Sequence, residues 1–439
     1  SSEVRLIKSD SPDMNPQIFL PREEDHLYSV DHDPASSRFL IESNWKALNF
    51  RLLETNLNDS SDKNKWKELI PHREQVLLQS VIPFPDHLII MERENGLRKL
   101  KILHKASNAV KEINFNDPTY TAYLASNPEY YVDRFYFGYS SMRTPDSLFS
   151  VMLSSGRKRL LKEAEVKGSF SSGDYKVDRE FIAARDGTQV PVSIVYKKNK
   201  FIKNGNPIFF YGYGSYGNSI DAGFSSSRLS LLDRGFIFAI AHVRGGQELG
   251  RSWYEDGKIF NKLNTFYDFI DVTKGLLEKG YGDKDRIYAG GGSAGGLLMG
   301  AIVNMEPNLY KGIISNVPFV DVITTMSDPS IPLTTGEYSE WGNPDIKEEF
   351  EYIMQYSPYD NISEQEYPSI LVTAGLWDSQ VQYYEPAKYV AKLRDYNKGK
   401  NPILMKVNMT AGHSGVSGRF ESLKELAMEY AFLLRLDSN

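Results

Sequence analysis

The first part of the chain is a series of short segments in which apolar and polar residues alternate. Alternation with a period of two is typical of half-buried β-strands. Pairs of such segments occupy residues 38–55, 87–103 and 134–153. Ile41, Ile89 and Phe135 lie at similar points within them, 48 and then 46 residues apart. A period in the forties made only of strands favours the blades of a β-propeller, with an ordinary antiparallel sandwich as the alternative.

From about residue 169 onward the pattern changes to apolar runs separated by segments of helical periodicity. Several of these runs are apolar on both faces, as in parallel strands that helices cover from both sides. The candidate strands are Pro191–Tyr196, Pro207–Tyr211, Phe236–His242, Arg286–Ala289, Gly312–Asn316, Ser369–Thr373 and Ile403–Val407. A final helix over 420–436 is expected to bury one face, formed by Phe420, Leu423, Ala427, Tyr430 and Leu434. The sequence therefore predicts about three blades plus a remnant at residues 1–168, and a mostly parallel α/β domain at residues 169–439.

Composition excludes several classes of function. The chain has 41% hydrophobic and 25% charged residues, which is ordinary for a globular protein, and its net charge of −6 argues against a nucleic-acid-binding surface. It has no cysteine, so thiol nucleophiles, disulfides and cysteine-ligated zinc are excluded. No apolar run approaches the ~18 residues of a membrane span. The seven histidines form no HExxH motif, and we expect neither a metal nor a cofactor.

The strongest chemical signal is the motif Gly291-x-Ser293-x-Gly295, which follows an apolar strand and opens an apolar helix. This is the context of a nucleophile elbow, in which serine occupies a tight turn and glycines let strand and helix approach. The backbone N–H of Ala294 would then face a developing oxyanion. A phosphate-binding loop is the alternative for Gly290–Gly296, but no Gly-Lys-Ser/Thr follows it.

A serine nucleophile needs a general base, usually histidine. In the α/β-hydrolase order of serine, acid and histidine, only His413 follows Ser293. His242, at the end of a predicted strand, is interpreted as structural. Asp378 is the favoured acid because it lies directly beyond a strand, where open α/β sheets place catalytic groups. Asp321 is the runner-up.

Several longer sequence segments then indicate a protein family. Tyr211-Gly-Tyr-Gly-Ser-Tyr-Gly, His242-Val-Arg-Gly-Gly and Pro332-Leu-Thr-Thr-Gly-Glu-Tyr-Ser-Glu-Trp-Gly-Asn-Pro resemble the oligopeptidase B group of the prolyl oligopeptidase family of serine peptidases. The resemblance implies a propeller before an α/β-hydrolase domain, and cleavage of short peptides after Arg or Lys in the cytoplasm. It also implies a triad of Ser293, Asp378 and His413, and makes Tyr213 the oxyanion donor beside Ala294.

The same resemblance makes Glu337 the main acid for the basic side chain that precedes the cleaved bond. The family usually carries a second Glu two positions later; here that position is Ser339, with Glu340 beside it. Asp221 matches the first of two acids that favour a second basic residue, and the other position is Gly223. We therefore expect a preference for single basic residues and a reduced gain from dibasic sequences.

Relative to the family's full chain, the early blades and a segment that completes the hydrolase domain are missing. The sequence thus suggests a C-terminal portion of a longer product, a second polypeptide that supplies the missing blades, or a decaying reading frame. The isolated chain is expected to be poorly soluble or weakly active. Two alternatives to a basic-residue peptidase remain: a proline-specific peptidase or esterase on the same fold, and a silent binding module.

Overall fold

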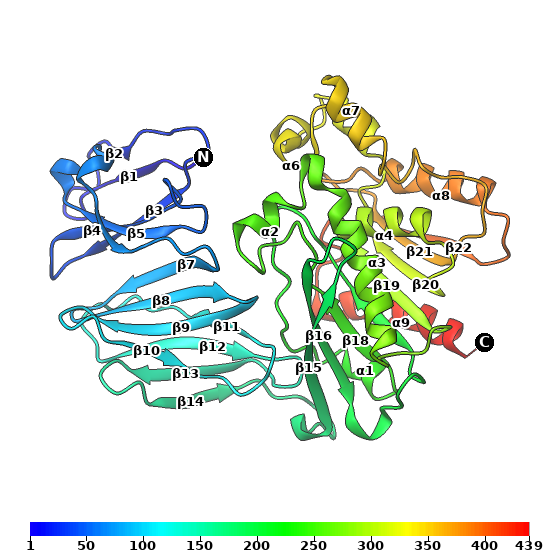
Figure 1. Cartoon of the computed structure of the whole chain (residues 1–439), viewed down its shortest axis with the longest axis horizontal. Coiled ribbons are helices and arrows are strands. Elements are labelled where there is room, and N and C mark those ends of the chain that lie inside the picture. Colours follow the sequence, from blue (N-terminus) through cyan, green and yellow to red (C-terminus); the bar gives the residue numbers. More distant parts are fainter. Residues whose placement is uncertain (439) are drawn as a thin grey trace. The chain divides into compact units, whose positions relative to one another are not determined.

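The computed structural model describes residues 1–438 and divides the chain into two compact units. One unit consists of residues 1–167 together with 248–252, and the other contains residues 168–247 and the chain from Trp253 onward. The last residue of the domain predicted at 169–439 lies outside the described residues. Each unit has its own sheets (Figure 1).

The first unit is a series of antiparallel sheets of four strands each (Figure 1). Ile41, Ile89 and Phe135 each lie on the second strand of their sheet and are completely buried. The repeat seen in the sequence is therefore one blade long, and the prediction of a partial propeller is confirmed. The blades are β3 (Tyr28–Asp33), β4 (Arg38–Ser43), β5 (Arg51–Thr55) and β6 (Lys67–Ile70); β7 (Val76–Pro83), β8 (His87–Glu94), β9 (Leu97–His104) and β10 (Val110–Ile113); and β11 (Thr121–Leu124), β12 (Arg134–Ser140), β13 (Ser147–Met152) and β14 (Lys158–Glu163). A two-stranded antiparallel sheet, β1 (Val4–Leu6) with β2 (Gln17–Leu20), precedes these blades in the chain.

Side chains packed between successive sheets form the cores of this unit. Leu40 and Leu52 of one blade pack with Leu78 and Leu88 of the next. The second and third blades share a core that is rich in aromatic residues, including Phe137. Because each core lies between neighbours rather than within one sheet, no single blade buries its own apolar faces.

The second unit contains one eight-stranded sheet in the order β15-β16-β18-β17-β19-β20-β21-β22. Its strands are β15 (Tyr175–Ala183), β16 (Gln189–Lys197), β17 (Ile208–Tyr211), β18 (Ile237–Ala241), β19 (Ile287–Gly292), β20 (Gly312–Asn316), β21 (Ser369–Gly375) and β22 (Ile403–Asn408). The strands from β18 to β22 in this order run parallel, while β15 and β16 join antiparallel. Each of the seven candidate runs coincides with a strand, and β15 was missed. The strand that follows β17 in the chain, β18, lies on one side of it in the sheet, whereas β19 and the later strands lie on the other side. This reversal of strand order creates a topological switch point.

Helices connect these strands on both faces of the sheet. They are α1 (Leu229–Leu232), α2 (Arg251–Glu255), α3 (Leu263–Glu278), α4 (Ala294–Met305), α5 (Val322–Met326), α6 (Tyr338–Trp341), α7 (Lys347–Ile353), α8 (Tyr384–Tyr396) and α9 (Arg419–Asp437). The α3 and α4 helices pack against each other, and α8 packs against β21 and β22. The α9 helix packs against β20, where a Cβ at Gly312 would come within 2.7 Å of Leu436.

The predicted buried stripe of α9 is wrong in its first half. Phe420 is 76% exposed and Leu423 is 46% exposed, and Ala427 is also exposed. Phe432 and Leu433, which lay outside the predicted stripe, are the buried residues instead. The buried residues lie towards the end of the helix, where Leu436 packs against Gly312 of β20.

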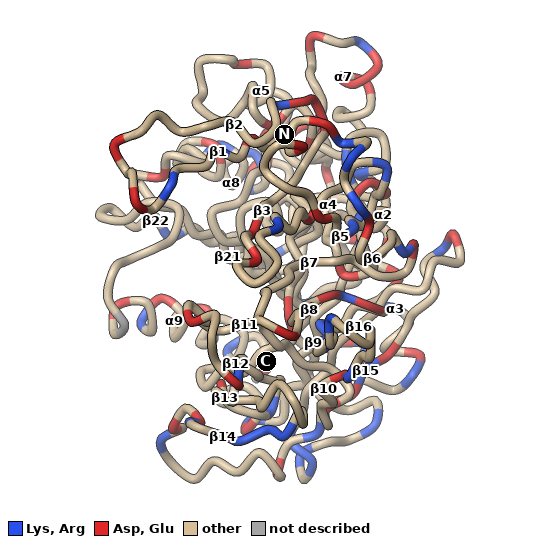
Figure 2. Tube along the Cα trace, turned by 90° about the vertical axis from the view of Figure 1, so that its left-hand side faces the viewer, with Lys and Arg blue, Asp and Glu red and all other residues tan. Residues whose placement is uncertain are grey.

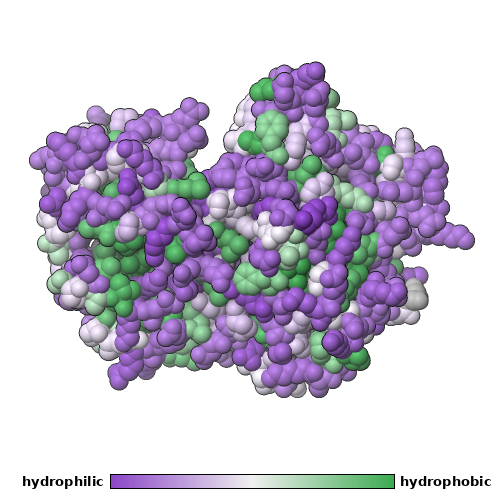
Figure 3. Space-filling view, viewed as in Figure 1, coloured by the Kyte–Doolittle hydropathy of each residue, from purple (hydrophilic) through white to green (hydrophobic). Residues whose placement is uncertain are grey.

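The surface charges and apolar residues add two observations. Acidic and basic residues are interspersed along the trace (Figure 2). Apolar residues reach the surface over the propeller sheets (Figure 3). Within residues 1–438, no helix is both long enough and apolar enough to cross a membrane.

Candidate active site

Ser293 lies on a strained turn between β19 and α4. Its φ of 57° and ψ of −118° are unusual for a residue with a side chain. Two backbone hydrogen bonds hold the turn. The Ser293 N–H donates to the carbonyl of Asn316 at 2.8 Å, and the Ser293 carbonyl accepts from the N–H of Phe319 at 3.1 Å. A Cβ at Gly291 would lie 2.4 Å from the carbonyl oxygen of Gly295, so only glycine allows this turn.

His413 and Asp378 meet at the carboxyl ends of two adjacent strands. Asp378 follows β21, His413 follows β22, and the His413 Nδ1 to Asp378 Oδ2 distance is 2.7 Å. The other carboxylate oxygen accepts the backbone N–H groups of Gln380 and Val381 at 2.8 and 2.9 Å. Burial opposes ionisation of Asp378, but the hydrogen bonds from His413 and from these two N–H groups outweigh it, so its pKa lies below the ordinary value.

Tyr213 and Ala294 lie beside the serine. Tyr213 follows β17, and it lines the same cavity as Ser293. Burial raises the pKa of Tyr213 to about 12, so the phenol keeps its proton at neutral pH. Ala294 is the first residue of α4, the helix that begins at the elbow.

A cavity of about 230 Å³ opens beside Ser293, with Tyr213, Tyr216, Phe319 and Glu337 among its lining residues. The Oε2 atom of Glu337 accepts hydrogen bonds from the Tyr216 hydroxyl and from the Trp341 indole N–H, both at 2.9 Å. These two donors fix the orientation of the carboxylate. The cavity therefore combines a serine hydroxyl with an oriented acid, next to apolar and aromatic walls.

Two residues predicted to bind substrate lie elsewhere. Glu340 is only 2% exposed and accepts hydrogen bonds from the Tyr216 N–H at 2.8 Å and the Tyr254 hydroxyl at 2.6 Å. Its interpretation as a substrate-binding residue is corrected, because both of its oxygens are engaged inside the fold. Asp221 is half-buried in the loop between β17 and α1 and does not line the cavity beside Ser293.

The alternative candidates for base and acid are also internal residues. The Nε2 atom of His242 is 2.7 Å from the Ser193 hydroxyl, and the side chain is buried. Asp321 is 1% exposed and forms an ion pair with Lys388. Their contacts fit structural roles.

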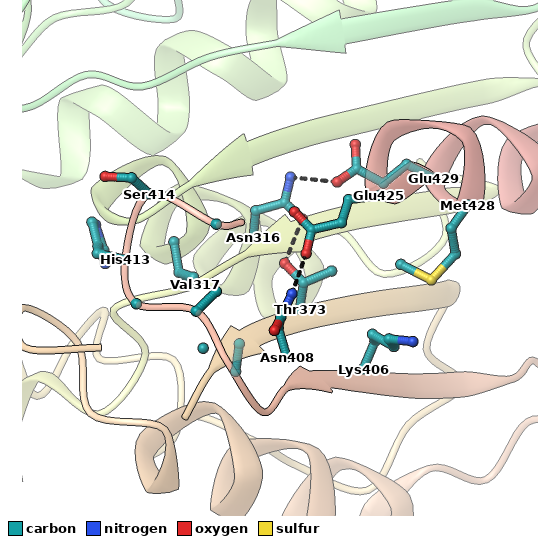
Figure 4. A pocket seen from close by; sticks show the side chains of 15 residues that line it. Asn316, Val317, Thr373, Lys406, Asn408, His413, Ser414, Glu425, Met428 and Glu429 are labelled. Atoms are coloured by element: carbon teal, nitrogen blue, oxygen red, sulfur yellow. Dashed lines mark hydrogen bonds between the residues drawn. The ribbon is translucent and has the colours of Figure 1, made fainter. Parts of the chain in front are cut away.

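A second cavity, of about 190 Å³, lies on the α9 side of the His413 loop (Figure 4). Glu429 accepts from the Asn316 amide at 3.0 Å, and Glu425 accepts from the Asn408 amide at 2.7 Å. Asn316 holds the Ser293 N–H through its carbonyl. Sequence reasoning missed these two glutamates, since only helical spacing on α9 relates them to one another and nothing relates them to the serine.

We expect Glu429 to make stability depend on pH. Burial raises its pKa to about 7, the Asn316 amide opposes the shift and Glu425 adds to it. A carboxyl group whose pKa rises on folding costs stability increasingly from about pH 4.5 to pH 7, and the cost is constant above that range. Glu429→Gln should therefore stabilise the protein at pH 8, by at most about 3 kcal/mol, and much less at pH 5.

Thermal unfolding of Glu429→Gln at pH 5 and pH 8 measures this difference. Glu425→Gln is the matched control, because it lies one turn away on α9 and also accepts an amide hydrogen bond. Equal shifts for the two variants, or a Glu429→Gln effect that does not change with pH, would contradict the prediction.

The fold and this site define the class of protein. A serine on a strained strand–helix turn, followed by an acid and a histidine on loops after two later strands, is the arrangement of an α/β hydrolase, here preceded by propeller blades. Residues 222–438 match the model of the prolyl oligopeptidase family, and residues 1–164 match that of the prolyl oligopeptidase N-terminal β-propeller domain. The chain belongs to the prolyl oligopeptidase family.

Individual relatives agree with this assignment. The chain is 47% identical to dipeptidyl aminopeptidase BI of Pseudoxanthomonas mexicana, over 99% of this chain and 60% of that protein. It is 43% identical to protease 2 of Moraxella lacunata, over 99% of this chain and 62% of that protein. The structure of oligopeptidase B from Leishmania major matches with a TM-score of 0.92 and 40% identity, over 99% of this chain and 62% of that one. The chain thus spans about three-fifths of the length of these relatives.

Proposed function

We propose that this chain carries the catalytic machinery of a serine oligopeptidase that cleaves short peptides after Arg or Lys. The observation that carries the proposal is that Glu337 and Ser293 line the same cavity. A guanidinium or ammonium group is costly to desolvate without a partner, and a carboxylate offers it a charge-assisted hydrogen bond. The oriented acid of Glu337 therefore favours a basic side chain next to the reacting carbonyl.

In the first half-reaction, the Ser293 hydroxyl attacks the peptide carbonyl and His413 takes its proton. Asp378 accepts the Nδ1–H of His413 at 2.7 Å, which leaves Nε2 as the basic nitrogen and stabilises the imidazolium that forms. His413 then gives the proton to the leaving amine. The products of this step are an acyl-enzyme and the released C-terminal peptide.

The negative charge on the tetrahedral intermediate needs donors that are in place before the reaction. The Tyr213 phenol, which stays protonated, and the N–H of Ala294 supply them. In the second half-reaction, water attacks the acyl-enzyme with His413 as its base. The Ser293 hydroxyl is then restored and the new carboxylate leaves.

A fluorophosphonate probe tests the nucleophile, and matched amide substrates test the specificity. We expect labelling at Ser293 and faster hydrolysis of Arg-amides and Lys-amides than of Pro-amides or neutral esters. Faster hydrolysis of Pro-amides or neutral esters would favour the alternative peptidase or esterase. Absence of labelling at Ser293 would instead favour a silent binding module.

We expect little gain from a second basic residue. The family's second acid for this position is replaced by Gly223, and Asp221 lies outside the cavity beside Ser293. A fluorogenic Arg-Arg substrate should therefore exceed its Gly-Arg counterpart in kcat/KM by less than about tenfold, the factor that 1.4 kcal/mol provides. A gain of a hundredfold or more would contradict the prediction.

The relatives described above are longer than this chain, which spans about three-fifths of their length. This difference leads to a proposal about the chain that a full enzyme needs. We propose that additional chain, continuous or supplied by a second polypeptide, is needed for full activity of residues 1–439. The exposed Phe420 and Leu423 of α9 and Leu404 of β22 support it, since large apolar side chains gain stability when covered. A cytoplasmic location and the absence of nucleic-acid, membrane and cofactor partners stay predictions.

A further inference from the structure

One short loop carries residues of both parts of the proposed site, the oxyanion donor and the wall beside the specificity acid. Residues 212–217 follow β17 and carry Tyr213, which lines the cavity beside Ser293, and Tyr216, whose hydroxyl donates to Glu337. Gly214 and Tyr216 have φ angles of 73° and 60°, so the loop adopts an unusual backbone conformation. Such a conformation persists only where the surrounding structure holds it.

Lys262 lies beneath this loop and is completely buried. Its ammonium group donates to the Gly214 carbonyl at 2.5 Å, the Ser215 hydroxyl at 2.8 Å and the Gly257 carbonyl at 3.2 Å. Two of these three acceptors belong to the loop and directly follow Tyr213. The same carbonyl of Gly214 is packed so closely that a Cβ at Gly245 would lie 1.9 Å from it.

Glu340 holds the next residue of the loop. It accepts the Tyr216 N–H at 2.8 Å and the Tyr254 hydroxyl at 2.6 Å. Burial lowers the pKa of Lys262 to about 8, and the charge of Glu340 opposes the shift. The loop is therefore fixed at three consecutive residues, 214 to 216, by one buried cation and one buried anion.

Stability alone is a weak reason to bury Lys262 and Glu340. Well-packed apolar residues of similar volume often stabilise a fold as much as buried charged groups do, or more. In addition, Lys262 and Glu340 fix the positions of two polar backbone groups, the Gly214 carbonyl and the Tyr216 N–H. No apolar side chain could form these hydrogen bonds. Neither residue touches the reacting atoms, so their effect on the reaction has to pass through the loop.

We propose that Lys262, assisted by Glu340, is a positioning residue that holds the 212–217 loop so that the Tyr213 hydroxyl meets the developing oxyanion at Ser293. The inference rests on the proposed function, because it assumes that Ser293 is the nucleophile. It adds a residue to the machinery that has no contact with the substrate. Its effect should appear in kcat and should depend on Tyr213.

A double-mutant cycle tests this dependence. Lys262→Met, Tyr213→Phe and the double variant are compared by kcat on p-nitrophenyl acetate, with thermal unfolding measured for each. Lys262→Met should lower kcat by about tenfold to a hundredfold, a part of the effect of losing one oxyanion donor. In the Tyr213→Phe background, Lys262→Met should lower kcat by less than about threefold, because there is no Tyr213 hydroxyl left to position.

Equal losses in both backgrounds, or a lower unfolding temperature with unchanged kcat, would overturn the inference. Lys274→Met is the matched control, since this exposed lysine of α3 pairs with Glu306 and should leave kcat unchanged. If Lys262→Met does not fold, Ser215→Ala removes one of its acceptors and takes its place in the cycle.

The substrate separates this inference from the proposed specificity. A small acetate ester needs no basic side chain, so the cycle gives its result even if Arg-amides prove to be poor substrates. A wild-type chain that neither hydrolyses the ester nor is labelled at Ser293 would overturn the nucleophile assignment, and the positioning role with it. If the wild-type chain is labelled at Ser293 but the effects of Lys262→Met and Tyr213→Phe on kcat are additive, only the role of Lys262 would be overturned.

Discussion

Alanine at position 293 should lower kcat for peptides and for small esters by about a million-fold, as removal of a triad nucleophile does in other serine hydrolases. The reason is that His413 has no hydroxyl to deprotonate and no acyl-enzyme forms. The Cβ is retained, so the strained turn and its hydrogen bonds to Asn316 and Phe319 should persist. Single-turnover assays and fluorophosphonate labelling of the purified variant measure the loss.

Ser414→Ala is the control for this change. Ser414 is exposed and directly follows His413, and its replacement should alter kcat by less than about twofold, as expected for a surface site. An Ser293→Ala variant that retains one-hundredth of the wild-type rate, or a probe adduct on another residue, would remove Ser293 from the proposed mechanism.

The second large effect is expected at Glu337. Glu337→Gln should lower kcat/KM for Arg-amides by about a hundredfold to a thousandfold, because a desolvated guanidinium loses its carboxylate partner at a cost of about 3–4 kcal/mol. Hydrolysis of a neutral acetate ester should change little. Steady-state rates on the two substrates, reported as their ratio, isolate the specificity from any general loss of activity.

Glu340→Gln is the matched control, since the two acids are three residues apart and both contact Tyr216. It should lower the unfolding temperature and slow both substrates together, and so leave the ratio of Arg-amide to ester unchanged. The assignment of specificity to Glu337 would fail if Glu340→Gln changed that ratio as much as Glu337→Gln does.

Local patterns explain why much of the site was predictable. Gly291 and Gly295 indicate the elbow through a short motif. A Cβ at Gly291 would collide with the nearby backbone of Gly295, while a Cβ at Gly295 would approach the distant backbone of Gly212. The choice of His413 needed only the order of residue types along the chain. The blade length was visible because Ile41 and Ile89 repeat the same buried position on the second strand of successive sheets.

Other features depended on distant parts of the chain. The resemblance made Glu337 the main acid and left Glu340 as a second candidate beside Ser339. Only the packing of Tyr216 and Tyr254 showed that Glu340 is internal. The predicted stripe of α9 has one helical periodicity throughout, so periodicity could not show that Phe420 and Leu423 are exposed while Phe432 and Leu433 are buried.

The amino-acid order by itself determined the succession of blades and hydrolase strands and the elbow serine, and it indicated Asp378 and His413 as the candidate acid and base. These depend on local sterics, on strand periodicity and on chain order. Only the tertiary structure showed that Glu340 is internal, and only it placed Lys262 under the Tyr213 loop and Glu425 and Glu429 beside the His413 loop. The physical reason is that burial and hydrogen-bond partners come from residues tens to more than a hundred positions away, and no short-range pattern encodes those contacts.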